Sequence, residues 1–299
     1  MRKIILFILV GSLILGLGAF SYADGVGTTG ASCLKLGVGA RASAMGDAFS
    51  AIADDATSIY WNPAGLTQIE GTQLGATHTQ WLEEINYEHL AYVSSHRDSA
   101  FGLSINWLNT GKIEETTLSY PGGTGNSFEA KSSVVTLAYA RKMGESLSLG
   151  AGLKYIGEKF EKESATSYGL DLGGFYKKQK FSFALGVQNI GNKEKFTEEE
   201  DPLPLNYRLG MAYLLNERIK LALDVNKPLD NEVNFHTGIE CHLTDTLALR
   251  AGYKSGPEDI GSGITGGLGF KFKNISIDYA YVPYEDLGDT HRISLSVKF

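Results

Sequence analysis

The chain has 299 residues and a formal net charge of −7, from 34 acidic and 27 basic side chains. This acidic balance argues against nucleic acid as a partner, because proteins that bind the phosphate backbone carry a basic surface. Glycine is abundant, with 36 residues, proline is scarce, with 7, and there are 15 tyrosines and 14 phenylalanines. Such a composition fits long strands with girdles of aromatic side chains.

The first residues have the features of a secretory signal peptide. Met1-Arg2-Lys3 precedes an apolar run from Ile4 to Phe20, and Ser21-Tyr22-Ala23 places small residues at the first and third positions of a cleavage site. We therefore expect cleavage before Asp24, with residues 1–23 removed. The alternative is an uncleaved membrane anchor, but the glycines within the run weaken a permanent helix. No later window approaches the roughly 18 apolar residues that a transmembrane helix needs.

Residues 37–52 combine a glycine-rich start with an apolar continuation. The run Gly37-Val38-Gly39-Ala40-Arg41-Ala42 mimics a dinucleotide-binding fingerprint. That function needs a βαβ unit that aims a helix N-terminus at pyrophosphate, and no such unit follows. We instead predict a flexible thread that leads into a short amphipathic helix, with Met45, Phe49 and Ile52 on one face.

Residues 53–66, Ala-Asp-Asp-Ala-Thr-Ser-Ile-Tyr-Trp-Asn-Pro-Ala-Gly-Leu, predict a compact knot of short helical turns. Asp55 is placed to cap a helix over residues 56–60, because its carboxylate can accept from free backbone N–H groups. Asn62 caps the next turn, with Pro63 at its first position, where the missing N–H costs nothing. Gly65 is expected to allow a positive-φ exit. The knot is too short to be a domain and too apolar to be left in water.

Three stretches around this knot carry a family resemblance. Residues 39–49 (Gly-Ala-Arg-Ala-Ser-Ala-Met-Gly-Asp-Ala-Phe), 53–56 and 61–66 (Trp-Asn-Pro-Ala-Gly-Leu) resemble the N-terminal region of the PorV/PorQ family, within the wider group of FadL-like outer-membrane barrels. The resemblance implies a barrel of about fourteen strands. It also implies that the N-terminal segment, residues 24–70, folds inside the barrel as a hatch that includes the Asn-Pro-Ala turn.

The resemblance makes the knot the candidate gate of this hatch. Movement near the Asn-Pro-Ala turn would open a path through the barrel. Trp61 has two open roles, either as an anchor that holds the hatch against the wall or as a ring that contacts a ligand. The candidate gating residues are Asp54, Asp55, Trp61, Asn62, Pro63, Ala64 and Gly65.

From residue 71 onward, apolar and polar side chains alternate with a period of two. Residues 219–226 (Ile-Lys-Leu-Ala-Leu-Asp-Val-Asn) are one example among many. Such alternation marks strands with one apolar and one polar face. We predict an all-β fold in which residues 71–299 form a transmembrane antiparallel barrel. The expected strands lie at approximately 72–80, 87–95, 99–110, 131–141, 146–158, 166–177, 180–190, 206–215, 218–227, 233–243, 246–255, 263–272, 275–284 and 290–299.

The predicted connections alternate in length. Those after even-numbered strands are short, such as Ser95-His96-Arg97-Asp98 and Asn216-Glu217, whereas those after odd-numbered strands include 111–130, 190–205 and 255–262. Outer-membrane barrels have this alternation, with short periplasmic turns and longer outer loops. A soluble sandwich has no reason to follow it. Because the strand count is even, we expect both ends of the chain on the periplasmic side.

The polar face of the predicted strands favours a barrel over a sandwich. An apolar face alone fits both, because a sandwich also buries one face. The other face carries charges that must be hydrated or paired, and a closed barrel keeps such groups inside without leaving a sheet edge. The candidate lumen-lining residues are Lys154, Asp171, Asp224, Glu240, Arg250 and Asp278.

The last strand has the character of an assembly signal. Ile293, Leu295, Val297 and Phe299 alternate with polar residues, and Phe299 ends the chain. A terminal aromatic residue on such a strand resembles the signal that the outer-membrane barrel assembly machinery recognises. With the predicted signal peptide, it indicates export to the outer membrane.

The chain shows no motif for catalysis, a metal or a cofactor, so we do not expect an enzyme. His236 and His242 alone cannot complete a metal site without a third ligand, and no nucleophile elbow is present. Cys33 and Cys241 could form a disulfide in an oxidising periplasm, but two unpaired small apolar residues are the preferred interpretation. Acidic runs in the outer loops, such as residues 198–201, allow cation bridging, although solvated loops are the simpler interpretation.

Two function hypotheses follow from the resemblance. The first is gated passage of small hydrophobic molecules, fatty-acid-like or aromatic, across the outer membrane, and its substrate class comes from the FadL-like resemblance alone. The alternative is a PorV/PorQ-like accessory of type IX protein secretion that binds exported cargo or partner proteins, although no long insert for cargo is evident. A structural barrel without a ligand is a third option. The expected partners are outer-membrane lipid, the barrel assembly machinery, and either a hydrophobic ligand or secretion-system proteins.

Overall fold

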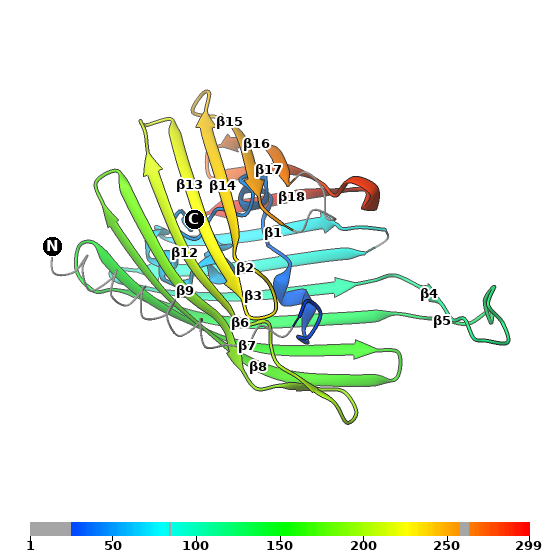
Figure 1. The fold of residues 1–299 in the computed structure, drawn as a ribbon. Coiled ribbons are helices and arrows are strands. Elements are labelled where there is room, and N and C mark those ends of the chain that lie inside the picture. The colour runs from blue at the N-terminus through cyan, green and yellow to red at the C-terminus, as the bar shows by residue number, and fades with distance from the viewer. Residues whose placement is uncertain (1–24, 84, 257–262) are drawn as a thin grey trace.

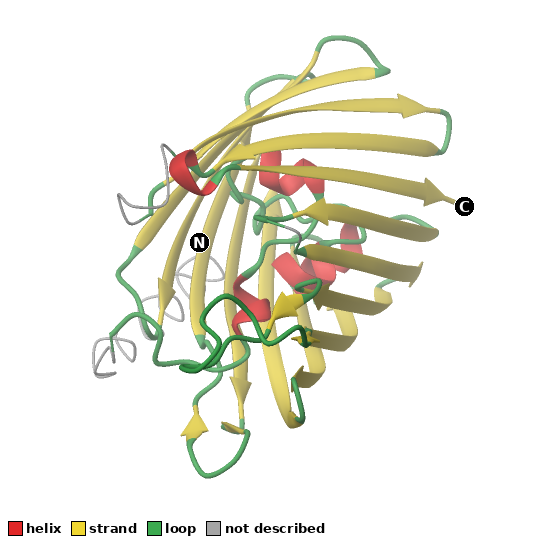
Figure 2. Ribbon diagram, turned by 90° about the vertical axis from the view of Figure 1, so that its right-hand side faces the viewer, coloured by secondary structure: helices red, strands yellow, loops and turns green. Residues whose placement is uncertain are grey.

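The computed structural model describes residues 25–83, 85–256 and 263–299, so the predicted signal peptide lies outside the described residues. Fourteen antiparallel strands close into a barrel in which β1 pairs with both β2 and β18 (Figures 1 and 2). The predicted fold is therefore confirmed. The barrel strands are β1 (Thr72–Gln80), β2 (Asn86–His96), β3 (Ser99–Asn109), β6 (Ala130–Lys142), β7 (Leu147–Phe160), β8 (Glu163–Lys178), β9 (Phe181–Gly191), β12 (Asn206–Leu214), β13 (Ile219–Pro228), β14 (Asn234–His242), β15 (Leu247–Lys254), β16 (Ile264–Phe272), β17 (Ile275–Pro283) and β18 (Asp289–Lys298).

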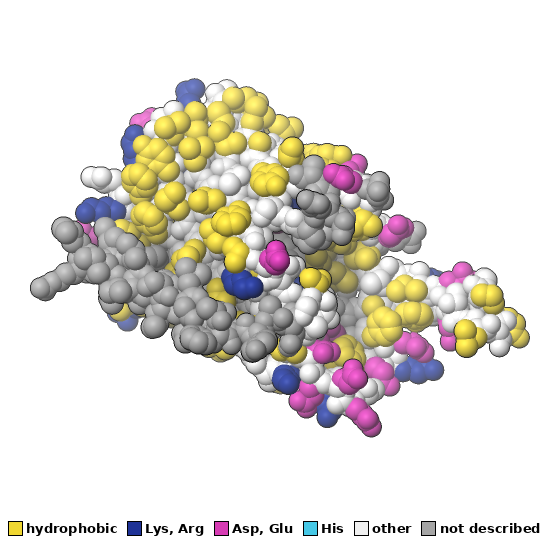
Figure 3. All heavy atoms as spheres, in the orientation of Figure 1, with side chains coloured by type: hydrophobic (Ala, Val, Ile, Leu, Met, Phe, Trp, Pro, Cys, Tyr) yellow, Lys and Arg dark blue, Asp and Glu magenta, His cyan; other side chains and the backbone are white. Residues whose placement is uncertain are grey.

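The outside of the barrel is apolar because the side chains of each strand alternate between the two faces. Phe101, Leu153 and Ile264 are each more than 60% exposed, a placement that favours lipid over water as the surrounding medium. Figure 3 shows hydrophobic side chains spread over the wall formed by β12, β13 and β14. Among the described residues, no helix has the length and apolar character needed to cross a membrane.

The two ends of the barrel differ in their connections. At one end, here called the inner end, tight turns join β2 to β3, β6 to β7 and β8 to β9, and Phe299 lies beside Thr72. At the outer end, the β3–β6 connection forms an arm with β4 (Ile113–Glu114) and β5 (Ser127–Phe128), which projects from the barrel (Figure 1). The β9–β12 connection carries β10 (Glu194–Lys195) and β11 (Glu200–Asp201), and η4 (Glu285–Leu287) lies before β18.

Residues 25–70, here called the hatch, fill the lumen with short helical turns (Figure 2). The turns are η1 (Ser32–Lys35), α2 (Ala40–Ala44), α3 (Ser58–Trp61) and η2 (Pro63–Gln68). The hatch begins at the outer end, where Lys35 pairs with Asp230 and Gly30 N–H donates to Pro202, and it descends to β1 at the inner end. The expectation that both chain ends lie at the inner end therefore holds for Phe299 and is wrong for the first described residues.

The predicted amphipathic helix is shorter than expected. The helix α2 ends at Ala44, because Gly46 and Asp47 both have positive φ angles of 64°. Met45, Phe49 and Ile52 consequently lie on turns and not on one helical face, yet all three are buried. The apolar pattern predicted their burial correctly and their secondary structure incorrectly.

Candidate functional site

Of the two caps that the sequence of the knot predicts, the Asn62 cap is present, whereas α3 begins at Ser58, with Thr57 as its N-cap residue and no side-chain cap. The Asp55 Oδ1 atom accepts from Thr57 N–H at 2.9 Å, just before α3 begins. The Asn62 Oδ1 atom accepts from Ala64 N–H at 3.1 Å, and Pro63 is the first residue of η2. Gly65 differs from its prediction: it lies inside η2 without a positive φ. It is glycine because the Ala53 carbonyl group approaches too closely for a side chain.

The same knot lies directly against the barrel wall. Asn62 Nδ2 donates to the carbonyl oxygens of Ser50 at 3.3 Å and Gly174 at 3.2 Å. The Pro63–Ala64 backbone lies against Gly150 of β7, where any Cβ would collide with it, and the Asn62 side chain occupies the corresponding space above Gly173 of β8. Three of the predicted gating residues thus form the contact that closes the lumen along β7 and β8.

A network of buried charges holds the other side of the hatch. Arg41 of α2 donates through Nε and Nη2 to Glu240 of β14, at 2.7 and 2.8 Å, and through Nη1 to Asp54 at 2.5 Å. Glu240, which has no exposed surface, also accepts from Arg250 Nε at 2.8 Å. Arg250 in turn pairs with Asp278 at 2.8 Å. With Asp55, which lies 3.3 Å from Arg41, five of the predicted site residues belong to this network.

The electrostatics of Asp54 explain why the network is stable. Burial disfavours its charged form, but the attraction of Arg41 and Lys220 outweighs that cost and holds the pKa of this carboxyl well below its usual range. The Lys220 Nζ atom lies 3.1 Å from Asp54 Oδ2. Asp55 also approaches Arg41, at 3.3 Å. The Asp54 carboxylate thus stays ionised and bound to cations at neutral pH.

The remaining predicted lumen-lining residues also face the lumen, away from the Arg41 network. Asp224 of β13 accepts from the backbone N–H groups of Phe49 at 3.3 Å and Ser50 at 3.0 Å. Lys154 of β7 pairs with Asp171 of β8 at 2.7 Å. The Lys154 Nζ atom also donates to Asn189 at 2.6 Å, beside a register shift between β8 and β9. Asp224 binds the hatch, whereas the Lys154 pair joins wall strands.

Trp61 is a buried anchor of the hatch in this structure. Its indole N–H donates to the Val38 carbonyl at 2.9 Å, and Phe49 lies edge-on to its ring at 6.3 Å between centroids. The Arg208 guanidinium lies over the ring at 4.8 Å. Only 2% of Trp61 is exposed, so contact with a ligand would require the hatch to move.

Sequence reasoning missed Arg41 and Arg292 as site residues. Arg292 of β18 is 1% exposed and donates to the Gly37 carbonyl at 3.1 Å and to the Ser43 hydroxyl. A signal for Arg41 was available, since it is a lone cation in a Gly-Ala-Ser run that faces a wall rich in carboxylates. Cys33 and Cys241 are both free, with Cys33 buried.

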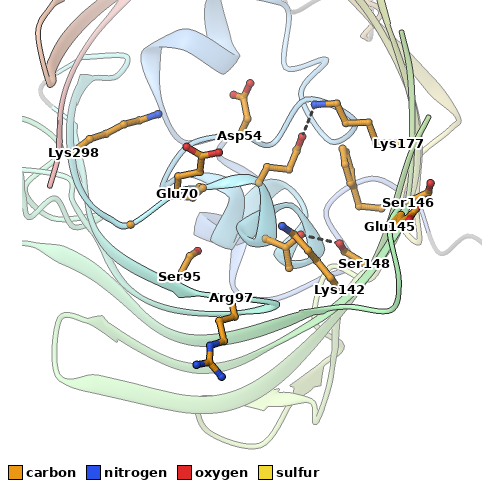
Figure 4. A pocket seen from close by; sticks show the side chains of 15 residues that line it. Asp54, Glu70, Ser95, Arg97, Lys142, Glu145, Ser146, Ser148, Lys177 and Lys298 are labelled. Carbon is orange, nitrogen blue, oxygen red and sulfur yellow. Dashed lines mark hydrogen bonds between the residues drawn. The ribbon is translucent and has the colours of Figure 1, made fainter. Parts of the chain in front are cut away.

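A polar cavity of about 590 Å³ lies below the hatch at the inner end (Figure 4). Asp54 and Glu70 of the hatch line it, and Lys142, Lys177 and Lys298 reach into it from different parts of the wall. The Lys177 Nζ atom donates to Gln68 at 3.4 Å. The inner face of the hatch is therefore hydrophilic, and a molecule that passed the hatch would enter a polar vestibule.

One family model and two curated relatives match parts of the chain. The family model described as "Type IX secretion system protein PorV" matches residues 22–231. A UPF0164 protein of Treponema pallidum (strain Nichols) is 27% identical over 189 residues, which cover 61% of this chain and 44% of the relative. A second UPF0164 protein of that organism is 25% identical over 181 residues, which cover 58% and 49%. The chain thus matches less than half the length of these curated relatives.

The similar solved structures include a toluene transporter and a monoaromatic hydrocarbon channel. The Ralstonia pickettii toluene transporter TbuX superposes with a TM-score of 0.65 at 16% identity, covering 88% of this chain and 98% of that one. The CymD monoaromatic hydrocarbon channel gives a TM-score of 0.68 at 15% identity, with the same coverage. A Pseudomonas aeruginosa FadL homologue gives 0.55 at 14% identity, covering 83% and 95%. At these identities the likeness establishes the fold alone.

Proposed function

Since the chain belongs to the PorV family and has a FadL-like barrel, we propose that it admits small hydrophobic molecules through an outer-membrane barrel gated by its own hatch. The observation that carries this proposal is the unequal attachment of the hatch. Ion pairs and charged hydrogen bonds tie it to β13–β18, whereas its opposite side meets β2, β3, β6 and β7 through apolar side chains.

The apolar side of the hatch, here called the apolar seam, consists of two clusters, one near each end of the barrel, and the buried Thr136 of β6 lies between them. Near the outer end, Cys33 and Leu34 contact Val134 and Ile156. The wall side of the inner part consists of small side chains, among them Ala100 of β3. Between the two clusters, a hydrophobic solute would meet neutral polar side chains such as Asn106 and Thr136, while Lys154 of β7 is already paired with Asp171. It need not break the ion pairs that hold the other side of the hatch, which would be costly. The seam is therefore the favourable route for such a solute, and the charged side is a barrier.

The seam is closed at the knot, so passage requires a local movement. Expelling the whole hatch would break several buried charge-assisted hydrogen bonds, each worth about 1.5–3 kcal/mol. Moving Asn62, Pro63 and Ala64 away from β7 and β8 breaks only neutral contacts, at about 1 kcal/mol for each hydrogen bond. We expect gating at this turn while Arg41 stays bound to Glu240.

The test is flux through purified barrels in liposomes. We expect the double variant Asn62→Ala, Pro63→Ala to take up a labelled fatty acid or aromatic hydrocarbon severalfold faster than the parent chain. Thr28→Ala, an exposed hatch substitution, is the matched control and should leave uptake unchanged. A heat-dependent shift in gel mobility verifies that each barrel is folded. Equal uptake by the parent chain, the double variant and empty liposomes would refute passage through the hatch.

A second candidate function is that of an accessory in type IX secretion. It is favoured by the family match, which spans the hatch and the arm that carries β4 and β5. On this arm, which projects from the barrel (Figure 1), Leu118 is fully exposed and Tyr120 is 63% exposed. Such side chains suit contact with a partner protein. Loss of co-purifying exported proteins on deletion of residues 112–128, without solute uptake by the parent chain, would favour this function.

A further inference from the structure

A hollow of about 470 Å³ lies near the outer end of the barrel, along β3, β6, β7 and β8. Its outward-facing floor is a row of small residues in cross-strand register. Ser133 pairs with Gly157, and Gly157 pairs with Thr166. Trp107 pairs with Ser133 and closes the row on the β3 side. We call this hollow the outer groove. It interrupts the apolar band that covers the rest of these strands.

The rows above and below the outer groove differ in character. Toward the membrane centre, the next row includes Tyr155 and Tyr168, whose rings lie edge to face at 5.7 Å between centroids. Toward the outer end, the next row includes Lys131 and Lys159, which pair across β6 and β7. Aromatic girdles mark the membrane–water interface of barrels. From the membrane centre outward, the aromatic row is followed by the row of small residues and then by the lysine row. This order places the lysines at the height of lipid headgroups.

The lysines give the outer groove a positive edge. Lys131 has an exposed side chain whose one ion pair, to Glu129 at 2.6 Å, leaves donors free. Within the described part of the chain, no carboxylate lies within ion-pair distance of Lys159. Lys112 and Lys162 border a second hollow that shares Lys131 and Lys159. The lining of that second hollow also includes Glu115, Glu129 and Glu161, so its four lysines outnumber its three acids by one.

Glu158, an acid among the residues that line the groove, does not pair with its lysines. Glu158 belongs to the inward-facing set of β7, and its Oε1 atom accepts from Ser132 Oγ at 2.7 Å inside the wall. Among the described residues, Glu129, which is bound to Lys131, is thus the one carboxylate within ion-pair distance of either groove lysine. Phosphate oxygens are the anions that lysine binds as a point charge at a membrane surface.

We propose that the outer groove binds a phosphorylated lipid of the outer leaflet. The headgroup phosphate lies against Lys131 and Lys159, and an acyl chain descends over Ser133, Gly157 and Thr166 onto the rings of Tyr155 and Tyr168. Trp107 flanks the chain with its amphipathic ring. This site is on the outside of the wall and does not depend on what passes through the lumen.

The test uses the full-length barrel in neutral detergent, with bound lipid counted by native mass spectrometry. The probes are phosphatidic acid, the diacylglycerol with the same acyl chains, and inorganic phosphate. We expect phosphatidic acid to bind the parent chain at least roughly tenfold more tightly than diacylglycerol, because two charge-assisted contacts are lost without the phosphate. Inorganic phosphate should neither bind measurably nor compete.

Two variants and one control locate the site. Lys131→Gln with Lys159→Gln should weaken phosphatidic acid binding roughly tenfold and leave diacylglycerol binding unchanged. Gly157→Leu fills the floor, where a Cβ meets only ordinary contacts, and should weaken both lipids. Lys178→Gln with Lys273→Gln removes two exposed lysines at the inner end and should change nothing. Unchanged binding in the Lys131 and Lys159 variant, an equal loss in the control, or competition by inorganic phosphate would each overturn the proposal.

Discussion

Glu240 shows how a single wall residue fixes the position of the hatch. Its carboxylate has no exposed surface and accepts from two guanidinium groups, one from Arg41 of the hatch and one from Arg250 of the wall. Losing one partner of such a buried pair costs about 3–5 kcal/mol, because the other charge is left without compensation. The Arg41 side of the hatch is therefore the fixed side, and movement is expected on the opposite side.

Glu194 makes the outer attachment of the hatch sensitive to pH. It is buried, and its carboxylate accepts from Ala31 N–H at 2.8 Å. Burial, and then the charge of Glu158, raise the pKa of Glu194 to about 7. The docked state therefore favours the protonated acid, and docking should weaken as the pH rises through 7, by roughly 1 kcal/mol between pH 6 and pH 8.

Hydrogen exchange at the Ala31 amide measures this effect, once the rates are corrected for the intrinsic pH dependence of exchange. We expect less protection at pH 8 than at pH 6 in the parent chain. Glu194→Gln cannot ionise and should keep the same protection at both values. Glu198→Gln, an exposed acid in the same connection, should behave like the parent chain. A rise in protection with pH in the parent chain would contradict the assignment of this effect to Glu194. Protection that still depends on pH in the Glu194→Gln variant would also contradict it.

At the scale of elements, glycines in the wall strands accommodate the hatch. Gly102 of β3 faces Ile59, Gly150 faces Ala64, Gly238 of β14 faces Met45, and Gly252 of β15 faces Gly46. At each position a Cβ would collide with the hatch. The hatch thus follows a path along the lumen where the wall residues have no side chains.

The substitution Gly150→Ala tests this role at the gate. The new methyl group would meet the backbone of Pro63 and Ala64, and overpacking of this kind costs about 1–3 kcal/mol. We expect the knot to move away from β7, with faster solute uptake in liposomes and an unchanged barrel. Gly152→Ala is the matched control, because its methyl group would find only ordinary contacts with Thr136 and Asp171. If both variants took up solute at the same rate, the contact between Gly150 and the knot would not control the gate.

The strands could be predicted from sequence because their signal is local. A period of two fixes which residues face lipid, and the predicted spans differ from the observed ones by at most a few residues. The hatch could be predicted only in part. The Asn62 cap depends on neighbouring residues, whereas the Gly65 close approach and the Arg41 network depend on partners that are distant along the chain. Alternation along single strands carries no information about such partners.

At the scale of the whole molecule, the backbone of Phe299 extends the pairing that closes the barrel. The Phe299 N–H group donates to the Thr72 carbonyl at 2.8 Å, and Thr72 N–H donates back at 3.3 Å. These backbone bonds complete the pairing of β1 with β18. The aromatic ring adds little to this closure, because 72% of Phe299 is exposed. The ring is therefore available for recognition before the barrel is assembled.

Phe299→Ala separates recognition from closure, because it removes the ring and keeps both backbone bonds. We expect the refolded variant to match the parent chain in stability to within about 0.5 kcal/mol, as is usual for an exposed position. In cells, we expect severalfold less assembled barrel in the outer-membrane fraction, measured by heat-dependent gel mobility. Leu295→Ala removes another outward side chain of β18 and should reduce assembly less. Equal assembly of all three chains would mean that the terminal ring is not a signal, whereas a loss of stability on refolding would mean that the ring supports the wall itself.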